Sequence, residues 1–422
     1  GIEQTKNIVV IGGGFGGVRS ALSLSGKLPP NYRIILIDKK DYHLPQWMLY
    51  EMATVKMESE KRKGYDEVNH VAKIPYSEIF QYYPDITFIQ GEVEDVFLDN
   101  KIVSYKPEVS GFEHRDFIKF EYAVLALGSE TNFFNIKGIS ERALGLKSFG
   151  DALNVRNSIA ELFSRKKKTE NINIVIGGGG FTGVEIATEM VNFIKQLSLG
   201  RGISPKRIRL SIVEAGPSVL SGSKSWLSRF AEKRIKNLGI SLFLNSPIEK
   251  FEDGQISLGG GRVMPADLLI WTAGIRPNVL IEHLAGVPIV KGCLVVDEYL
   301  RIVGHPSVYG IGDNVYCFNK ALQKPVPATS QRAVDQGRVG ANNICRIIRG
   351  EQEKKYVPKN PAFIVPLGGK YAVADVYGIP LVGFLAWGLK MIVGLKYLVS
   401  ILPWWKAFRL WLAGLAVYIR ND

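Results

Sequence analysis

The fold of this chain is limited above all by a local pattern that occurs twice. In the first copy, a short apolar strand at Asn7–Ile11 runs into a glycine-rich turn at 12–17 and then into a helical stretch from Val18. In the second copy, the strand is Asn173–Ile176, the turn spans 177–183, and a helical stretch follows from Val184. A strand, a tight glycine turn and a helix in this order predict parallel strands joined by a right-handed crossover. The sequence therefore predicts an α/β fold with two Rossmann-like units.

Both turns have the spacing Gly-x-Gly-x-x-Gly. The first glycine allows a tight turn, the second lets the backbone approach a pyrophosphate, and the third lets the helix pack close to the strand. These glycines are Gly12, Gly14 and Gly17 in the first copy, and Gly178, Gly180 and Gly183 in the second. One such motif is weak evidence, but two in the same strand–turn–helix setting are strong evidence for two dinucleotide sites.

The strand that follows each copy ends in an acid, which is Asp38 in the first and Glu214 in the second. Such a carboxylate can accept hydrogen bonds from a ribose. Because a carboxylate repels a 2′-phosphate, Glu214 favours NADH over NADPH. Two dinucleotide sites suggest a permanently bound flavin and an exchangeable nicotinamide, with a hydride passing between them. The strand at Val308–Asp313 ends in an acid suited to the flavin, and we expect it to return to the first domain.

From this pattern we predict three regions. A discontinuous FAD-binding domain covers 1–145 and 276–356, an NADH-binding domain covers 146–275, and a C-terminal region for membrane anchoring or dimerisation covers 357–422. The three cysteines are far apart and the five histidines are scattered, so we expect neither a disulfide framework nor a metal site.

The end of the chain has a distinct composition. Residues 376–421 contain no Asp or Glu, five Lys or Arg and four of the seven Trp. Placed on a helix, residues 404–420 separate into a basic face and an apolar face, which predicts an amphipathic helix in the plane of a membrane interface. This interpretation accounts for the net charge of +13 without nucleic acid. A core helix or a dimer-interface helix is the alternative.

Taken together, the motifs resemble those of type II NADH:quinone oxidoreductases, the non-proton-pumping NADH dehydrogenases among the two-dinucleotide-binding-domain flavoproteins. The resemblance covers nearly the whole chain, and residues 330–336 resemble the Ala-Gln-x-Ala-x-Gln signature of that family, with Ser330 in place of Ala and one additional residue before Gln336. The other matching segments are Val10–Gly17, Tyr42–His43, Leu49–Tyr50, Ala53–Thr54, Val124–Asn132, Gly178–Glu185, Trp271–Gly274 and Tyr309–Asp313. The resemblance implies hydride transfer from NADH to bound FAD, and then two-electron transfer to a membrane quinone.

The resemblance also implies the site residues. Glu185 resembles the acid that faces the nicotinamide, and Gln331 resembles a glutamine near the isoalloxazine at the quinone pocket. The FAD site is expected to include Gly12, Gly14, Phe15, Gly16, Gly17, Asp38, Lys39, Val93, Ala126, Gly128, Asp313, Ser330 and Gln331. The NADH site is expected to include Gly178, Gly180, Phe181, Thr182, Gly183, Glu185, Glu214, Ala273 and Gly274. Pro45 and Trp47 also depart from the family pattern, in the region of the quinone channel. We interpret His43 as a local hydrogen-bonding residue.

The resemblance further implies a homodimer and a peripheral, monotopic enzyme on the cytoplasmic side of the cell membrane. Two alternatives on the same fold are a sulfide:quinone oxidoreductase and an apoptosis-inducing-factor-like flavoprotein, in which NADH binding drives a partner interaction. The first needs cysteines beside the flavin, and this chain has no Cys before Cys293. A basic nucleic-acid-binding module is a third reading, which the composition of the C-terminal region disfavours.

Overall fold

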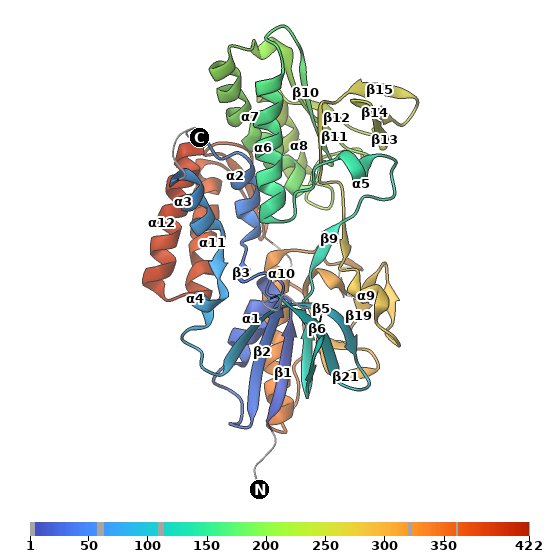
Figure 1. Ribbon diagram of the computed structural model, residues 1–422, viewed down its shortest axis with the longest axis vertical. Coiled ribbons are helices and arrows are strands. Elements are labelled where there is room, and N and C mark those ends of the chain that lie inside the picture. The colour runs from blue at the N-terminus through green and yellow to red at the C-terminus, as the bar shows by residue number, and fades with distance from the viewer. Residues whose placement is uncertain (1–4, 57–62, 109–113, 320–322, 360–361, 422) are drawn as a thin grey trace. The chain divides into compact units, whose positions relative to one another are not determined.

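The computed structural model describes residues 5–56, 63–108, 114–319, 323–359 and 362–421 (Figure 1). The chain forms two compact units. The first comprises Gly1–Leu44, Lys73–Glu130 and Arg276–Pro361, and the second comprises Pro45–Ala72, Thr131–Ile275 and Ala362–Asp422. These bounds differ from the three predicted regions: residues 45–72 and 131–145 fall in the second unit, and so do residues 362–422 of the predicted C-terminal region.

The first unit is built on an eight-stranded sheet in the order β20–β21–β8–β1–β2–β5–β6–β7. Its centre is parallel, because β1 pairs in parallel with both β2 and β8, and β21 pairs in parallel with β8. This confirms the predicted fold class and the return of residues near 308 to the first domain. The strands are β1 Lys6–Ile11, β2 Tyr32–Asp38, β5 Ile86–Phe97, β6 Ile102–Pro107, β7 Asp116–Lys119, β8 Tyr122–Leu125, β20 Arg301–Ile302 and β21 His305–Gly310.

Two helices of the first unit pack closely, α1 (Phe15–Leu24) and α10 (Ser330–Ile348). Gly337 allows the approach, because a Cβ atom there would lie 2.5 Å from the Gly16 carbonyl oxygen. The unit also contains β3 Tyr42–His43, β4 Ile74–Pro75, α4 Tyr76–Phe80, α9 Leu280–His283, β18 Ile289–Val290, β19 Cys293–Val295, η3 Gly312–Asn314, β22 Val315–Tyr316, β23 Phe318–Asn319 and β24 Lys324–Pro325.

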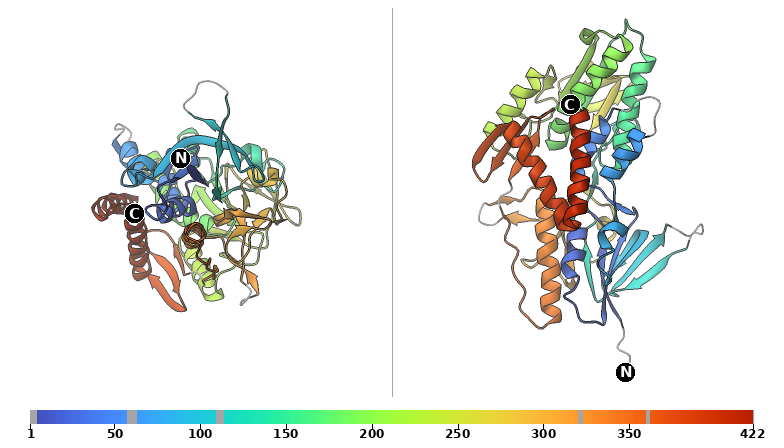
Figure 2. Two further views of the ribbon diagram at one scale, coloured as in Figure 1. Left: turned by 90° about the horizontal axis from the view of Figure 1, so that it is seen from below. Right: turned by 90° about the vertical axis from the view of Figure 1, so that its left-hand side faces the viewer.

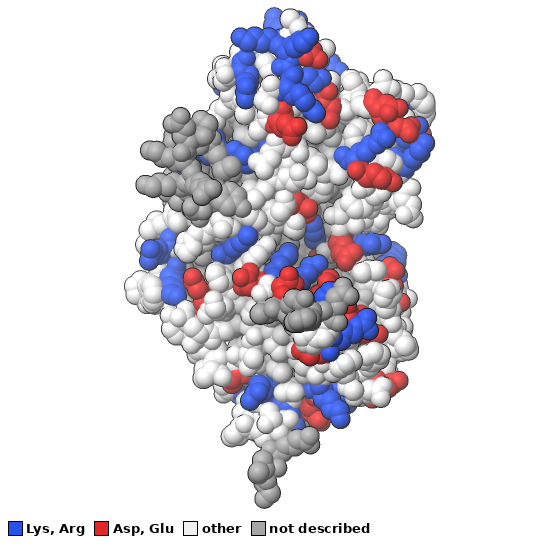
Figure 3. Space-filling model, in the orientation of Figure 1, with Lys and Arg blue, Asp and Glu red and all other residues white. Residues whose placement is uncertain are grey.

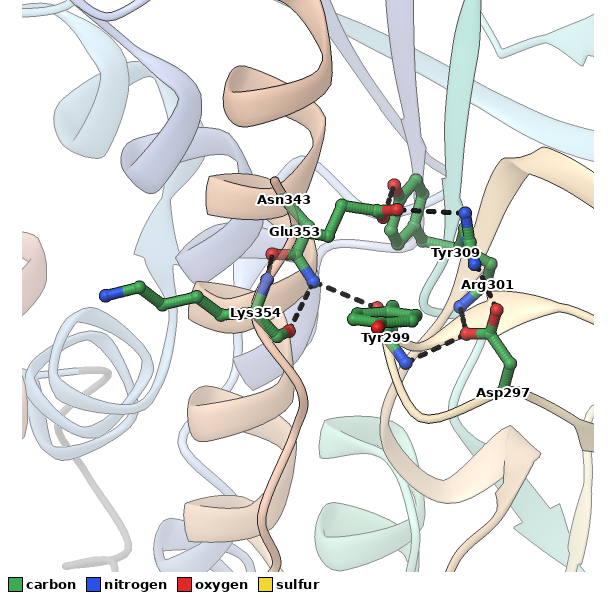
Figure 4. A network of polar contacts seen from close by, with 7 residues as sticks. All are labelled: Asp297, Tyr299, Arg301, Tyr309, Asn343, Glu353 and Lys354. Atoms are coloured by element: carbon green, nitrogen blue, oxygen red, sulfur yellow. Dashed lines mark hydrogen bonds and ion pairs between the residues drawn. The ribbon is translucent and has the colours of Figure 1, made fainter. Parts of the chain in front are cut away.

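A polar network ties the segment after α10 to β21 (Figure 4). Glu353 accepts a hydrogen bond from the Tyr309 hydroxyl at 2.7 Å and pairs with Arg301 at 2.9 Å. Arg301 also pairs with Asp297 at 2.8 Å. Asn343 of α10 exchanges two hydrogen bonds with the backbone of Lys354, at 2.8 and 2.9 Å. The network therefore fixes β21, the strand that leads to Asp313.

The second unit has a four-stranded parallel sheet in the order β12–β11–β10–β16, and a three-stranded antiparallel sheet, β13–β14–β15. Apolar side chains from both sheets share one buried core. The strands are β10 Ile172–Gly177, β11 Ile208–Val213, β12 Ser241–Phe243, β13 Ile248–Glu252, β14 Gln255–Leu258, β15 Arg262–Pro265 and β16 Leu268–Trp271. The helices are η1 Gln46–Met48, α2 Leu49–Ala53, α3 Lys63–Ala72, α5 Ile139–Arg142, α6 Phe149–Arg165, α7 Phe181–Arg201, η2 Pro205–Arg207 and α8 Ser225–Asn237.

The end of the chain packs within the second unit. An antiparallel sheet of β25 (Phe363–Pro366), β26 (Ala372–Val376) and β27 (Ile379–Gly383) leads into helices α11 (Phe384–Ile401) and α12 (Trp404–Asn421), which lie side by side (Figure 2). The indole of Trp411 in α12 donates to the Met391 carbonyl of α11 at 2.9 Å.

The outer surfaces of α11 and α12 are largely apolar. Among the described residues, α11 has the length and hydropathy of a membrane-crossing helix, and only 22% of it is buried. The predicted helix at 404–420 is present as α12, but Tyr418 does not belong to its exposed face. That side chain is buried in the unit, with its hydroxyl 3.3 Å from the sulfur of Met48.

Candidate dinucleotide sites

The first glycine turn has the shape of a phosphate-binding loop. Gly12 has a φ of +98°, in the region that favours glycine, and a Cβ atom on Gly17 would lie 1.7 Å from the Gly12 carbonyl oxygen. At Gly14, by contrast, a Cβ would meet no protein atom within 4 Å. Helix α1 starts directly after Gly14, without a side-chain cap, so its amide N–H groups face this open space. Such a helix start is suited to a pyrophosphate.

The second turn repeats this geometry. Gly178 has a φ of +111°, and a Cβ on Gly183 would lie 2.0 Å from the Gly178 carbonyl oxygen. Gly180 again opens onto space free of protein atoms within 4 Å, and α7 begins after it without a side-chain cap. Both helices start earlier than the predicted Val18 and Val184, because the last glycines of each motif lie inside the first helical turn.

The two predicted acids bind the glycine turns themselves. The two carboxylate oxygens of Asp38 accept from the amides of Gly13, at 2.7 Å, and Lys40, at 2.8 Å. Glu214 likewise accepts from Gly179 at 2.6 Å and Gly216 at 2.7 Å. Each acid thus joins the end of its strand to the adjacent turn. Their predicted contact with a ribose remains a prediction.

A cavity of about 370 Å³ lies beside the first turn. Four predicted FAD residues line it, namely Gly12, Asp38, Lys39 and Val93. Ligand pockets are commonly 300–1,000 Å³, so this cavity can hold part of a dinucleotide. The other lining residues were not predicted. Ile11, Ile37, Leu127 and Glu130 lie within or beside the matched segments, whereas the rest come from segments that carry no motif: Gly91, Glu92, Glu94, Asn278, Val279, Leu280 and His283.

Other predicted residues of the first unit gather after β8 and β21. Asp313 accepts from the hydroxyl of Ser129 at 2.8 Å, and the amide of Gly128 donates to the Asn314 side chain at 3.3 Å. Gly16 packs against Ile311, and the Ala126 carbonyl oxygen would lie 2.2 Å from a Cβ on Gly12. These contacts bring the ends of three parallel strands to one edge of the sheet.

The start of α10 carries Ser330 and Gln331. The Gln331 side chain is exposed and donates to Asp335 at 3.1 Å. Two residues of the same motif were not singled out from the sequence. Buried Gln336 accepts from the Gly312 amide at 2.8 Å, and Arg332 donates to the Gly312 carbonyl at 2.9 Å. The glutamine that closes the stretch 330–336, one position beyond the spacing of the signature, was the signal for the first of these.

The predicted residues of the second unit surround its glycine turn. A Cβ on Gly178 would lie 2.6 Å from Cα of Ala273, and one on Gly274 would lie 2.5 Å from the Phe134 ring. Phe181 stacks on Phe363 with ring centroids 5.4 Å apart, and Thr182 is exposed. Glu185 lies one turn into α7, and burial raises the pKa of its carboxyl group to about 8. Glu185 is therefore mostly a neutral acid at pH 7.

The cysteines do not form a redox centre of the kind that a dithiol reductase uses. Cys293, Cys317 and Cys345 are all free thiols, and burial raises the pKa of each, which lowers its reactivity. Within the described part of the chain, no group of three or more His, Cys, Asp or Glu side chains could hold a metal ion.

Two Rossmann-like units that each carry a phosphate-binding turn define a protein with two dinucleotide sites. Residues 6–337 match the family of pyridine nucleotide-disulphide oxidoreductases, and the chain belongs to this family. Within it, the chain is similar to the type II NADH:quinone oxidoreductases of Staphylococcus epidermidis, at 26% identity over 93% of this chain and 94% of the relative, and of Staphylococcus aureus, at 25% over the same shares. The similarity confirms the predicted resemblance.

Solved structures share the fold. NDH2 of Plasmodium falciparum, solved with NADH, superposes with a TM-score of 0.83 at 20% identity, over 97% of each chain. The sulfide:quinone oxidoreductase of Aquifex aeolicus superposes with a TM-score of 0.75 at 20% identity, over 96% of this chain and 92% of that one.

Proposed function

We propose that this chain is a type II NADH:quinone oxidoreductase, an FAD-dependent NADH dehydrogenase that reduces a membrane quinone without pumping protons. The observation that carries the proposal is the pair of open glycine turns in a single chain, at Gly14 and Gly180. Relatives similar over 93% of the chain bear that name.

The residues of the first unit fit FAD. The turn at 12–17 and the start of α1 can bind its pyrophosphate, and the cavity at Asp38, Lys39 and Val93 can hold its adenosine part. Gly128 and Asp313 lie where they can bind the remainder. When bound, FAD supplies the redox group between NADH and the quinone.

The second unit is suited to NADH. Its turn and the start of α7 can bind the pyrophosphate, and Glu214 can bind the adenine ribose. The 2′-phosphate of NADPH would be repelled by this carboxylate, so the site favours NADH. Because Glu185 is mostly protonated at pH 7, its carboxyl group can donate a hydrogen bond to the nicotinamide carboxamide. The Gln331 side chain is exposed at the start of α10, and we assign it the role of orienting a quinone carbonyl group.

Helices α11 and α12 are suited to a membrane surface. Trp404 and Phe408 of α12 are 71% and 45% exposed, and half-buried Lys406 and exposed Arg409 lie near them in the chain. In Figure 3, uncharged surface with basic side chains beside it occupies the edge where α12 lies. Apolar side chains entering the interface stabilise attachment by about 1.5–3 kcal/mol each, and basic residues add about 1 kcal/mol each. The exposed apolar residues are Phe384, Leu385, Ile392, Val393, Val399, Trp404, Trp405, Phe408, Leu412 and Ile419.

We assign the protein to the cytoplasmic side of the cell membrane as a peripheral, monotopic enzyme, and we expect a homodimer on the basis of the resemblance. Lipid-soluble quinone would then reach the protein from the membrane.

The visible absorption spectrum of the purified protein tests the function most directly. We expect a flavin spectrum that NADH bleaches without oxygen, and steady NADH oxidation once a short-chain quinone is added. A colourless protein that does not respond to NADH would refute the proposal. Slow turnover with a long-lived charge-transfer band would instead favour the apoptosis-inducing-factor-like alternative.

A further inference from the structure

The carbonyl group of Gly13, in the middle of the first glycine turn, is held by two buried side chains. It accepts a hydrogen bond from the Tyr76 hydroxyl at 2.7 Å, and Nδ1 of His43 lies 3.0 Å from it. Because a carbonyl oxygen can only accept, Nδ1 of His43 carries the hydrogen. His43 is 0% exposed and Tyr76 is 1% exposed, so neither hydrogen bond competes with bulk water.

Local pairing brings these two side chains together. Strands β3 and β4 form a two-stranded antiparallel sheet in which His43 lies opposite Ile74, and the Tyr76 amide donates to the Asp41 carbonyl at 3.0 Å. The Tyr76 ring packs against Phe88, with centroids 4.8 Å apart, and the His43 ring meets Phe15 edge-on at 5.2 Å. Both donors are therefore fixed in place before any ligand arrives.

The same contact explains why residue 13 is a glycine. Its φ is not in the left-handed region, so backbone conformation does not require glycine here. A Cβ atom at this position would lie 1.9 Å from the Tyr76 hydroxyl oxygen. The Tyr76 hydroxyl thus occupies the space that a side chain at residue 13 would need.

The second turn holds the corresponding carbonyl differently. Gly179 occupies the position of Gly13, and its carbonyl oxygen accepts from the backbone amide of Leu220 at 2.8 Å. The carboxylate contact is shared, since Glu214 accepts from the Gly179 amide as Asp38 does from the Gly13 amide. The tyrosine and histidine are therefore specific to the first turn.

We propose that Tyr76 and His43 are positioning residues for the pyrophosphate of the dinucleotide at the first turn. In a trans peptide, the carbonyl of Gly13 and the N–H of Gly14 point in opposite directions. Holding the carbonyl against Tyr76 and His43 aims the Gly14 N–H toward the open side of the turn. It also keeps the carbonyl oxygen from facing, and repelling, the phosphates. This inference rests on the proposed binding of FAD at this turn.

The test measures the rate at which the holoenzyme releases FAD. The holoenzyme is diluted, and the rise in flavin fluorescence reports the release. We expect Tyr76→Phe to release FAD about two to ten times faster than the wild type, the range for one lost hydrogen bond. His43→Phe, which keeps an aromatic ring but removes the ring N–H donor, should also release FAD faster. The KM for NADH should not change in either variant, since the second turn has its own anchor.

Tyr105→Phe is the matched control. It also removes the hydroxyl of a buried tyrosine in the first unit, one that hydrogen-bonds to Asp116. If Tyr76→Phe releases FAD no faster than Tyr105→Phe at equal loss of thermal stability, the positioning role is wrong. If the wild-type protein itself carries no FAD, the proposed function fails instead. Should Tyr76→Phe not fold, His43→Phe against the same control decides the question.

Discussion

Replacing Glu185 by glutamine should remove a pH dependence near pH 8 from the reduction of the flavin by NADH. Burial raises the pKa of this carboxyl group from 4.5 to about 8. The neutral acid can donate a hydrogen bond, but the carboxylate that forms above pH 8 cannot. Glutamine has nearly the same shape, stays neutral and still donates through its amide.

The size of the effect follows from the pKa. With a pKa of about 8, roughly 91% of Glu185 is protonated at pH 7 and roughly 9% at pH 9, so the wild-type rate should fall about tenfold between them. The rate of Glu185→Gln should vary less than about twofold over that range, and Glu185→Ala should be slow at every pH because it has no donor.

The assay is anaerobic stopped-flow absorbance of the flavin at saturating NADH from pH 6 to pH 9. If Glu185→Gln shows the same fall as the wild type, another group is responsible. If the wild-type rate rises through pH 8, the carboxylate is the active form and the assigned role is wrong.

The same ionisation should appear in protein stability. The folded pKa of about 8 lies above the unfolded value of 4.5, so this group's contribution is fully present below pH 4.5 and is lost as the pH rises through 8. At about 1.4 kcal/mol per pH unit, the full difference would be about 5 kcal/mol, and the partial exposure of Glu185 to solvent reduces it. The Tm of Glu185→Gln should therefore fall less than that of the wild type between pH 5 and pH 8.

Three further substitutions test other parts of the proposal. Glu214→Ala should lower the preference for NADH over NADPH in kcat/KM by about tenfold, because a charged hydrogen-bond acceptor is lost; an unchanged ratio would remove the ribose role. Gln331→Ala should slow flavin oxidation by quinone at least about threefold more than flavin reduction by NADH; equal losses in the two half-reactions would contradict its assignment. Phe408→Glu combined with Leu412→Glu should abolish flotation with anionic vesicles, since each lost side chain removes about 1.5–3 kcal/mol of attachment. Phe117→Glu, at a 63% exposed position of the first unit, is the matched control, and continued flotation of the double variant would exclude this surface.

The two glycine turns could be predicted from the sequence because their chemistry is local. A positive φ at Gly12 and Gly178 and the close helix approach at Gly17 and Gly183 are properties of a few consecutive residues. The apolar pattern of the sequence predicts the strand that follows each turn. Because that strand pairs in parallel with the first, the acid at its end lies beside the turn. Tyr76 gave no such signal, because its contact with Gly13 spans 63 residues and depends on the pairing of β3 with β4.

In the C-terminal region, the sequence predicted the helix but not which of its side chains pack against the protein. Its composition predicted an amphipathic helix in the plane of a membrane interface. In the structure, Asn421 donates to Glu51 of α2 at 2.8 Å, and Lys390 lies 4.5 Å from the centre of the Tyr50 ring. Removing residues 377–422 would therefore uncover α2, so point substitutions on the exposed face are the better test.

By itself, the amino-acid sequence determined the α/β class, the two dinucleotide turns and their order along the chain, because glycine spacing and strand periodicity act over short distances. Only the tertiary structure decided which side chains support those turns and which face of the last helix the protein buries. Such contacts join residues that are tens to hundreds of positions apart, and a helical projection cannot tell an apolar residue that faces lipid from one that faces the protein's own core.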